Sequence, residues 1–445
     1  MKIAVLTATI GSFMLLNLVH SKIAHFWHIT DFHYDPHYAT LDFNRRQCRI
    51  TIEERGGLGH HRAFGHLGDY SCDSPVELIK SALKFMRNQR TENLEFVLWT
   101  GDVTSSLYSN KEEDKYQAIR SMTELLRMTF SSDFVFPVLG DTDPEPSESL
   151  RIVWNHWLPL EVFETFNSGG YYTIEQTKSR LRIIALNTNL FKVDKEYGDA
   201  AREQWEWLDA VLKKATDKNE MVFIVGHAMP GSDNSCSSDT VSKYLRIVRQ
   251  HAAIIAGQFF GHLHVDTFRV IYDKDQPVSW AFLAPSVSPR NPKGASNPGL
   301  RLYKFDSVTG KVLGYTQYYL DLALANKAKA EWVAEYNFTQ YYGLRDISAE
   351  SLHLLAEKLK IGTTHEKTTF KKYLRAYNVK YNDGSNCDGA CAYQHFCAIT
   401  CLEQLIHEEC VEAARSALAA AGRAIVLAAP LVNIILIFIV CIVVI

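Results

Sequence analysis

The chain has 445 residues, a length that allows two or three domains, or one large α/β domain with an appendage. It is 47% hydrophobic and 22% charged, the composition of a globular protein, which argues against a disordered or low-complexity chain. The formal net charge of -3 argues against nucleic acid as the main partner, because such proteins favour a basic face. None of these quantities decides the oligomeric state.

Residues 1–21 are predicted to form a secretory signal peptide. Lys2 is an early charge, an apolar run extends to Val19, and Ser21 and Ala24 are small residues that suit cleavage. A buried N-terminal strand or helix is the alternative. The signal peptide would bring the protein into the secretory pathway.

Between about residues 25 and 320, short hydrophobic runs alternate with stretches that have helical spacing. Each run is rich in β-branched or aromatic residues and ends in Gly, Asp, His or Asn. Buried strands that alternate with helices indicate an α/β protein. Later runs indicate hairpin strands, with a turn at Thr309 and Gly310. We therefore expect mixed sheets in a catalytic domain over residues 25–320.

After Asp321 the composition changes to Ala, Lys, Glu and Tyr at helical spacing, as in "LANKAKAEWVAEYNFTQYYG". This spacing predicts a small helical C-terminal subdomain over residues 321–411, which wraps the main domain or folds alone. Asn337 begins an Asn-Phe-Thr tripeptide, a glycan acceptor in a secreted protein.

Residues 424–445 form a hydrophobic tail without a single charge. Twenty-two such residues can span a bilayer. Small residues such as Ser416 and Ala414 precede the tail at the spacing of a GPI-attachment signal. A retained membrane anchor and a buried helix are the alternatives to the GPI signal. Either kind of anchor places the folded part on the extracellular face of the plasma membrane, and a protein without one would be secreted.

Eight of the nine cysteines lie outside the tail, five of them clustered after residue 386. In an oxidising compartment cysteines in this number predict disulfide bonds. A zinc knuckle is the alternative for the late cluster, but the spacing is CxxxC rather than CxxC.

Seven polar side chains follow directly after the ends of hydrophobic runs. In open α/β sheets ligands gather outside the carboxyl ends of the strands, so residues far apart in sequence can converge there. One histidine in such a place is most often structural, whereas seven polar residues in equivalent places indicate a site. They are Asp31, His33, Asp102, Asp141, His227, His262 and His264.

Carboxylates and imidazoles together suit a pair of divalent metals such as zinc, manganese or iron. Alternate residues that leave a strand point to the same side, so Asp31 with His33, and His262 with His264, can bind from one direction. Two adjacent metals clamp the oxygens of an in-line displacement at phosphorus and make hydroxide available near neutral pH. The residues therefore indicate phosphoester hydrolysis.

The order DxH, GD, a Gly-led loop, GH and GHxH resembles the calcineurin-like metallophosphoesterases. More closely, "FWHITDFHYDPHY", "GDYSCDSP", "LNTNL", "IVGHAMPG" and "IAGQFFGHLH" resemble blocks of the acid sphingomyelinase-like phosphodiesterases, and the tail resembles their membrane-anchored branch. The resemblance extends over residues 25–410. It implies two zinc ions and a four-layer α/β sandwich, with two mixed sheets flanked by helices and a disulfide-bonded helical C-terminal subdomain.

The resemblance also implies roles for individual residues. It implies one metal held by Asp31, His33 and His264, a second held by His227, His262 and Asp141, and Asp102 as the bridge. It implies disulfide bonds of Cys48 with Cys72, Cys387 with Cys391, and Cys397 with Cys410, which leave Cys236 and Cys401 over.

The sequence departs from the family in the loop Gly140-Asp141-Thr142-Asp143, where the family has Gly-Asn-His-Asp. Asp141 can still bind zinc but adds a negative charge, so an anionic substrate should be attracted less. Thr142 replaces the expected proton donor, and Ser106 replaces a second phosphate-facing histidine. Loss of a general acid typically costs about 100- to 10,000-fold in rate.

Three hypotheses for the function are compatible with the sequence. The favoured one is a binuclear-zinc phosphodiesterase of weakened activity that cleaves a sphingomyelin-like lipid or a nucleotide. The second is a zinc-binding relative that binds lipid or nucleotide, or regulates a membrane, with little turnover. The third is a structural ectodomain stabilised by metal. Asp233, in a predicted loop beside the site, receives no role. The residues expected in catalysis are Asp31, Asp102, Asp141, Thr142, His227 and His262.

Overall fold

The computed structural model describes residues 22–40, 48, 64–89, 91–106, 112–176, 181–291, 294–360, 368–381, 387 and 389–417. The predicted signal peptide and the hydrophobic tail over residues 424–445 lie outside these segments. Within the described residues, no helix combines the length and the hydropathy that a membrane span requires.

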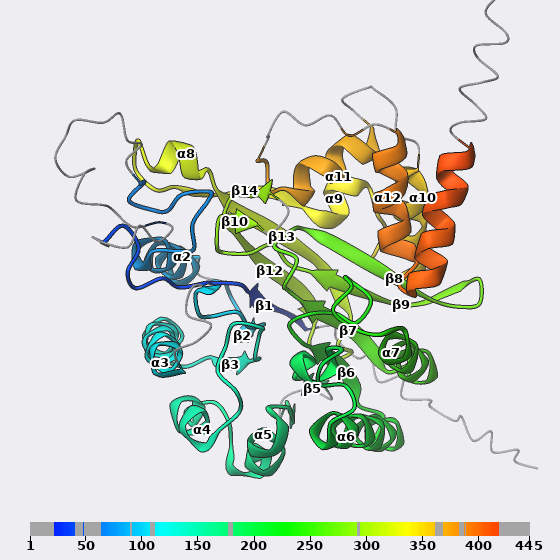
Figure 1. The fold of residues 1–445 in the computed structure, drawn as a ribbon, viewed down its shortest axis with the longest axis horizontal. Coiled ribbons are helices and arrows are strands. Elements are labelled where there is room, and N and C mark those ends of the chain that lie inside the picture. The colour runs from blue at the N-terminus through cyan, green and yellow to red at the C-terminus, as the bar shows by residue number, and fades with distance from the viewer. Residues whose placement is uncertain are drawn as a thin grey trace, which may run out of the picture.

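The first sheet has six strands and contains the N-terminal strand near its centre (Figure 1). Strands β1, β2 and β3 run parallel to one another, whereas β12, β13 and β14 add antiparallel strands on the other side of β1. The strand order is β14 (Trp332–Asn337), β13 (Val312–Leu320), β12 (Gly299–Asp306), β1 (Ile23–Ile29), β2 (Leu94–Trp99) and β3 (Phe134–Pro137).

The second sheet also has six strands and is mixed. Its middle strands β5, β6, β7 and β9 are parallel, and an antiparallel strand closes each edge. The strand order is β4 (Tyr172–Glu175), β5 (Leu181–Ala185), β6 (Met221–Val225), β7 (Ile255–Phe260), β9 (Gln276–Leu283) and β8 (Thr267–Asp273). Two mixed sheets confirm the predicted sheet type.

Aromatic side chains fill the space between the two sheets. The Phe26 ring in β1 stacks on Phe96 and Tyr303 of its own sheet, at centroid distances of 4.9 and 4.7 Å. It also meets Phe223 and Phe259 of the second sheet at 5.6 and 5.3 Å. Offset and edge-on aromatic pairs add to the free energy of burial. The interior of the sandwich is thus one continuous apolar layer.

Helices cover the outer side of each sheet (Figure 1). The first sheet is flanked by α2 (Val76–Asn88), α3 (Glu112–Thr129) and α4 (Glu148–Trp154). The second sheet is flanked by α6 (Asp199–Asp217) and α7 (Ser238–Gln250), and α5 (Phe163–Gly169) lies between α4 and α6. Each apolar helix face meets a sheet, as amphipathic spacing requires. The four-layer α/β sandwich is therefore confirmed.

The C-terminal region packs against the edge of the second sheet at β8 (Figure 1). The hydroxyl groups of Thr267 and Tyr373 lie 2.8 Å apart across this contact. The region contains α8 (Leu322–Ala325), α9 (Phe338–Tyr342), α10 (Ala349–Leu359), α11 (Thr369–Tyr377), α12 (Gly389–Thr400) and a helix over residues 404–417.

One segment of this region contradicts the helical prediction. Residues Trp332–Asn337 form strand β14, which pairs with β13 and extends the first sheet. The buried residues Trp332 and Tyr336 are four positions apart. That spacing places two side chains on one face of a helix and also on one face of a strand, so the pattern could not separate the two.

The cysteine pairings implied by the resemblance are confirmed. The structure contains Cys48–Cys72, Cys387–Cys391 and Cys397–Cys410. Because a disulfide uses up both thiolates, the zinc-knuckle alternative at the CxxxC segment is wrong. The other two cysteines in the described part of the chain, Cys236 and Cys401, are free thiols that line one small cavity between the loop after β6 and the end of α12.

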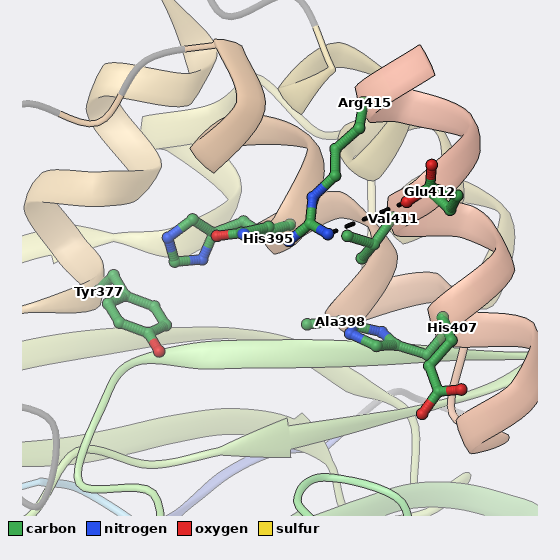
Figure 2. Close-up of a pocket in the computed structure, with 9 residues that line it drawn as sticks. Tyr377, His395, Ala398, His407, Val411, Glu412 and Arg415 are labelled. Carbon is green, nitrogen blue, oxygen red and sulfur yellow. Dashed lines mark ion pairs between the residues drawn. The ribbon is translucent and has the colours of Figure 1, made fainter. Parts of the chain in front are cut away.

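A larger cavity of about 670 Å³ lies between the C-terminal helices (Figure 2). Figure 2 shows His395, His407 and Tyr377 around it, with an ion pair of 3.9 Å between Arg415 and Glu412 at the helix over residues 404–417. None of the seven predicted metal-binding residues lines this cavity.

Candidate metal centre

The predicted site residues lie where the strands of both sheets end. Asp31 and His33 follow β1, Asp102 follows β2, and His262 and His264 follow β7. All five have positive φ angles, between 43° and 69°. Residues other than glycine rarely adopt this left-handed conformation, which is concentrated at functional sites. The strained turns aim these side chains into one space between the sheets.

The first group of converging side chains consists of Asp31, His33, Asp102 and His264. The Nε2 atoms of His33 and His264 are 3.0 Å apart. His264 Nε2 lies 3.1 Å from Asp31 Oδ1, and His33 Nε2 lies 3.3 Å from Asp102 Oδ2. Asp31 Oδ1 is buried and accepts no hydrogen bond from the described residues. Four ligand atoms therefore converge on one point, and one of them, Asp31 Oδ1, has no hydrogen-bond donor among the described residues.

The second group consists of Asp102, His227 and His262. His227 Nε2 lies 3.2 Å from Asp102 Oδ2 and 3.3 Å from His262 Nδ1. Asp102 Oδ2 thus stands between His33 and His227 and belongs to both groups. Asp141 lies at the rim, with Oδ2 3.5 Å from His262 Nδ1.

Backbone carbonyl groups hold two of the histidine rings from behind. Nδ1 of His227 donates to the carbonyl oxygen of Thr100 at 2.7 Å, and Nδ1 of His264 donates to that of Arg290 at 2.6 Å. Once it gives up its second proton, each of these two rings therefore directs the lone pair of Nε2 to the centre, which is the tautomer a metal requires. Converging carboxylate oxygens and imidazole lone pairs fit two divalent cations that share Asp102.

Electrostatics give the same picture of a cation-binding centre. Burial by itself would raise the pKa of Asp31, but His264 and His227 outweigh it and hold that pKa well below its usual range. Burial would lower the pKa of His227, yet Asp102 and Asp31 raise it to about 10. The carboxylates thus attract positive charge strongly, and a bound metal would take the place of the protons on the imidazoles.

Thr142 and Asp143 make hydrogen bonds that join the loops around the centre. The Thr142 hydroxyl donates to the carbonyl oxygen of Thr104 at 2.7 Å, and its N–H donates to Asp102 Oδ1 at 2.9 Å. The Asp143 carboxylate accepts from the N–H groups of Gly140 and Val103, both at 2.8 Å. Burial and the neighbouring Asp102 raise the pKa of Asp143 to about 6. Thr142 therefore orients Asp102 through its backbone.

Glycine is required where these loops approach each other. A Cβ atom on Gly140 would lie 2.2 Å from the backbone nitrogen of Asp102, and one on Gly261 would lie 2.0 Å from Thr30 Oγ1. Real Cβ atoms do not come so close, so larger residues would push the loops apart. The glycines that precede Asp141 and His262 thus allow these two residues to reach the centre.

Three charged residues of the site were not identified from the sequence. Lys192 Nζ contacts Asp141 Oδ2 at 2.8 Å, so the additional negative charge at position 141 has a counter-ion. The expectation that Asp141 lowers the attraction of an anionic substrate took no account of Lys192. Asp233 Oδ2 accepts from His262 Nε2 at 2.6 Å and fixes the tautomer of that ring. Arg290 is the third.

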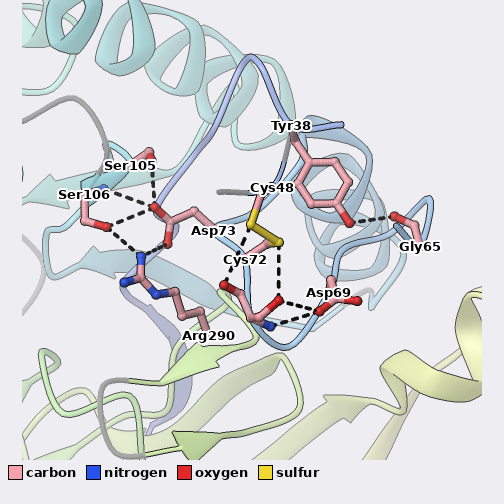
Figure 3. Close-up of a disulfide and its surroundings, with 10 residues drawn as sticks. Tyr38, Cys48, Gly65, Asp69, Cys72, Asp73, Ser105, Ser106 and Arg290 are labelled. Carbon is pink, nitrogen blue, oxygen red and sulfur yellow. Dashed lines mark hydrogen bonds and ion pairs between the residues drawn. A yellow bond between two sulfur atoms is a disulfide. The ribbon is translucent and has the colours of Figure 1, made fainter. Parts of the chain in front are cut away.

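Arg290 belongs to a cluster with Asp73 and Ser106 (Figure 3). Its Nη1 donates to Ser106 Oγ at 2.8 Å and to Asp73 Oδ1 at 3.2 Å. Asp73 lies inside the block "GDYSCDSP", which was a signal in the sequence, whereas Arg290 and Lys192 follow no recognisable spacing.

Comparisons with known proteins agree with this geometry. Residues 24–266 match the calcineurin-like phosphoesterase family, and residues 276–417 match the acid sphingomyelin phosphodiesterase C-terminal region. The human cyclic GMP-AMP phosphodiesterase SMPDL3A is 34% identical over 424 residues, which cover 88% of this chain and 90% of the relative.

Two further relatives cover similar shares. The human acid sphingomyelinase-like phosphodiesterase 3b is 33% identical, covering 84% of this chain and 87% of the relative. The sphingomyelinase phosphodiesterase C of Dictyostelium discoideum is 30% identical, covering 85% of this chain and 90% of the relative.

The fold and the Asp/His centre therefore define a metallophosphoesterase, a phosphodiester hydrolase. Within that class, the chain belongs to the acid sphingomyelinase-like family of calcineurin-like phosphoesterases.

Proposed function

We propose that the protein is a binuclear-zinc phosphodiesterase of weakened activity, which hydrolyses a phosphodiester or phosphoanhydride bond in a nucleotide or a sphingomyelin-like lipid. One observation carries the proposal: Asp102 Oδ2 lies 3.3 Å from His33 Nε2 and 3.2 Å from His227 Nε2, the arrangement of a carboxylate shared by two metals. The names of the relatives and of the matching family supply the two substrate classes, cyclic GMP-AMP and sphingomyelin.

In this proposal Asp31, His33 and His264 hold one zinc ion, and Asp141, His227 and His262 hold the other, with Asp102 between them. Bound zinc would supply Lewis acidity and a hydroxide nucleophile near neutral pH. Lys192 offsets the charge of Asp141, and Thr142 orients Asp102 through its N–H.

The weakened activity is inferred from positions 106 and 142. The Thr142 hydroxyl is used by the carbonyl oxygen of Thr104, and the Ser106 hydroxyl lies 3.2 Å from Asp73 Oδ2. A hydroxyl group is a poor acid near neutral pH, so neither side chain replaces a histidine as proton donor. The enzyme should therefore depend on leaving groups that need no protonation.

A leaving-group series tests this function. Zinc-loaded protein should hydrolyse bis(4-nitrophenyl) phosphate at least about 100-fold faster than an alkyl phosphodiester such as sphingomyelin. Asp102→Asn removes the shared carboxylate charge and should abolish both activities. Protein with two bound zinc ions that cleaves neither substrate would contradict the proposal.

Restoring the histidines tests the cause of the weakened activity. The double variant Ser106→His, Thr142→His should hydrolyse the alkyl substrate faster by about 100-fold or more, because it regains a proton donor. The rate with the aryl substrate should change much less. An unchanged alkyl rate would mean that another group supplies the proton.

The second candidate function is a zinc-binding relative that binds a lipid or nucleotide, or regulates a membrane, without turnover. The occupied hydroxyl groups of Thr142 and Ser106 favour it, since the metal-binding residues converge while neither of these two side chains is a proton donor. Calorimetry with cyclic GMP-AMP and with sphingomyelin vesicles would show binding without product in that case.

We also propose that the protein enters the secretory pathway and is held at the extracellular face of the plasma membrane by its C-terminal tail. Three disulfide bonds support an oxidising compartment. If the tail is a GPI signal, phosphatidylinositol-specific phospholipase C should release the protein from intact cells. Retention after this treatment favours a membrane-spanning tail, and protein found only in the medium contradicts anchoring.

A further inference from the structure

Arg290 begins the short strand β10 (Arg290–Asn291), which pairs with β11 (Gly294–Ala295). Figure 3 shows its guanidinium reaching toward Asp73 and Ser106. Asp73 is only 2% exposed, and its Oδ2 also accepts from the Ser105 hydroxyl at 2.6 Å. The anchor of the guanidinium is thus a buried, hydrogen-bonded carboxylate.

Three contacts place this cluster at the edge of the metal centre. The carbonyl oxygen of Arg290 accepts from Nδ1 of His264 at 2.6 Å. The N–H of Ser288 donates to the carbonyl oxygen of Asp31 at 3.0 Å. The Ser106 hydroxyl, which receives the guanidinium N–H, stands four residues after Asp102 on the same loop. Arg290 therefore touches one candidate metal ligand and extends over the loop of another.

The guanidinium still has donors for a bound anion. Among the described residues, both of its hydrogen bonds use Nη1, which leaves Nε and Nη2 for other partners. Its side chain is 37% exposed, so it is not sealed into an ion pair with Asp73. A guanidinium fork matches two oxygens of a phosphate, which makes arginine well suited to phosphate recognition.

We propose that Arg290 binds the non-bridging oxygens of the scissile phosphodiester and supplies there the positive charge that the missing histidines at positions 106 and 142 would supply. The inference rests on the proposed phosphodiesterase function and specifies how that site recognises its anion. Asp73 and Ser106 hold the guanidinium in place. Because a guanidinium does not give up a proton near neutral pH, Arg290 binds charge but does not act as the general acid.

The test compares zinc-loaded wild type with Arg290→Gln and Arg290→Lys. Calorimetry measures binding of inorganic phosphate, and bis(4-nitrophenyl) phosphate gives kcat and KM. Arg290→Gln should weaken phosphate binding and lower kcat/KM, each by about 10- to 100-fold. The lysine variant should recover part of both, since it keeps the charge and loses the fork.

Arg249→Gln is the matched control. Arg249 is 32% exposed and pairs with one carboxylate, Glu403, at 3.3 Å. It lines a cavity at the C-terminal helices and none of its described contacts is to the metal centre, so phosphate affinity and kcat/KM should stay at the wild-type values.

Elemental analysis and thermal unfolding separate phosphate recognition from a structural role. The proposal requires that Arg290→Gln keeps two zinc ions and its unfolding midpoint. Wild-type phosphate affinity in Arg290→Gln would overturn it, as would weakened binding that accompanies loss of zinc. If Arg290→Gln does not fold, Arg290→Lys decides, since wild-type phosphate affinity in that variant excludes the bidentate contact. If wild type binds phosphate but cleaves no diester, the proposed phosphodiesterase function is wrong. Calorimetry of the variants still tests whether Arg290 binds phosphate.

Discussion

At the scale of single residues, Asp233 shows how a carboxylate outside the metal centre acts on it. Its Oδ2 accepts the Nε2 proton of His262 at 2.6 Å, and His262 then presents Nδ1 toward His227 and Asp141. The pKa of Asp233 stays below its usual range because the contact with His262 outweighs burial. A carboxylate, an imidazole and a metal in this order fix the ring orientation and raise its basicity as a ligand.

We predict that Asp233→Asn weakens binding of the second metal by about 10- to 100-fold, because the amide holds the His262 ring less firmly. Competition with a zinc chelator would measure the affinity of each site. Asp239→Asn is the control, since Asp239 is exposed at the start of α7. Equal loss at both sites, or unchanged affinity, would show that Asp233 does not orient this ligand.

The sequence predicted that seven candidate residues converge because each follows a hydrophobic run, and six of them form the two groups of ligands, whereas Asp141 lies at the rim. Parallel strands bring their ends to one edge, so position along the chain implies position in space. Lys192, Asp233 and Arg290 could not be predicted in this way. Lys192 and Asp233 lie in irregular segments and Arg290 lies in the two-residue strand β10, and the conformation of such segments depends on tertiary contacts that no periodicity records.

At the scale of elements, strand β14 shows where the pattern failed. Its sequence "WVAEYN" contains Ala and Glu, which favour helix, and its buried residues have a spacing that a helix shares. The free edge of β13 decides the outcome, because pairing with it satisfies backbone groups and buries Trp332 and Tyr336 in the sandwich. Only the tertiary context provides that edge.

The same strand contains a carboxyl group with a raised pKa. The pKa of Glu335 lies well above its usual range because of burial and the nearby charge of Asp266, although Lys380, Arg375 and Arg301 act against the shift. Its Oε2 is buried and accepts no hydrogen bond from the described residues. The folded state therefore holds the Glu335 proton up to a higher pH than the unfolded state does.

We predict that Glu335→Gln reduces the loss of stability as the pH rises. A carboxyl group whose pKa is higher in the folded than in the unfolded state keeps its proton longer when folded. The contribution of this group to the free energy of unfolding therefore decreases as the pH rises above the ordinary glutamate pKa of about 4.3. Urea unfolding at pH 5 and pH 8 should show the larger gain for the variant at pH 8. Glu331→Gln, at an exposed position, should show no such difference. A gain independent of pH would contradict the assignment.

At the scale of the whole molecule, a buried ion pair joins the two sheets. Arg301 in β12 of the first sheet lies 2.6 Å from Asp266, which directly precedes β8 of the second sheet. The hydroxyl groups of Tyr315 and Tyr336 donate to the same carboxylate. The backbone N–H of Asp266 donates to the carbonyl oxygen of Tyr377 in α11 at 3.1 Å. Asp266 thus connects both sheets and the C-terminal helices.

Removing Asp266 and removing Arg301 should change the free energy of unfolding in different ways. Asp266→Asn leaves a guanidinium buried without a counter-charge, and because arginine cannot lose its proton, unfolding should become easier by about 3 to 5 kcal/mol at any pH near neutral. Arg301→Met leaves a carboxylate that can take up a proton, and burial already raises the pKa of Asp266. That variant should therefore lose less stability at pH 5 than at pH 8.

Urea unfolding of both single variants and of the double variant at these two pH values measures the asymmetry. The double variant should be less destabilised than the sum of the single ones, since it leaves no unpaired charge in the interior. Asp273→Asn, at the exposed end of β8, should have little effect. If Arg301→Met lost the same stability at both pH values, proton uptake by Asp266 would be excluded.

His264 lies only two residues before Asp266, so Asp266→Asn should also weaken zinc binding in the first group of ligands.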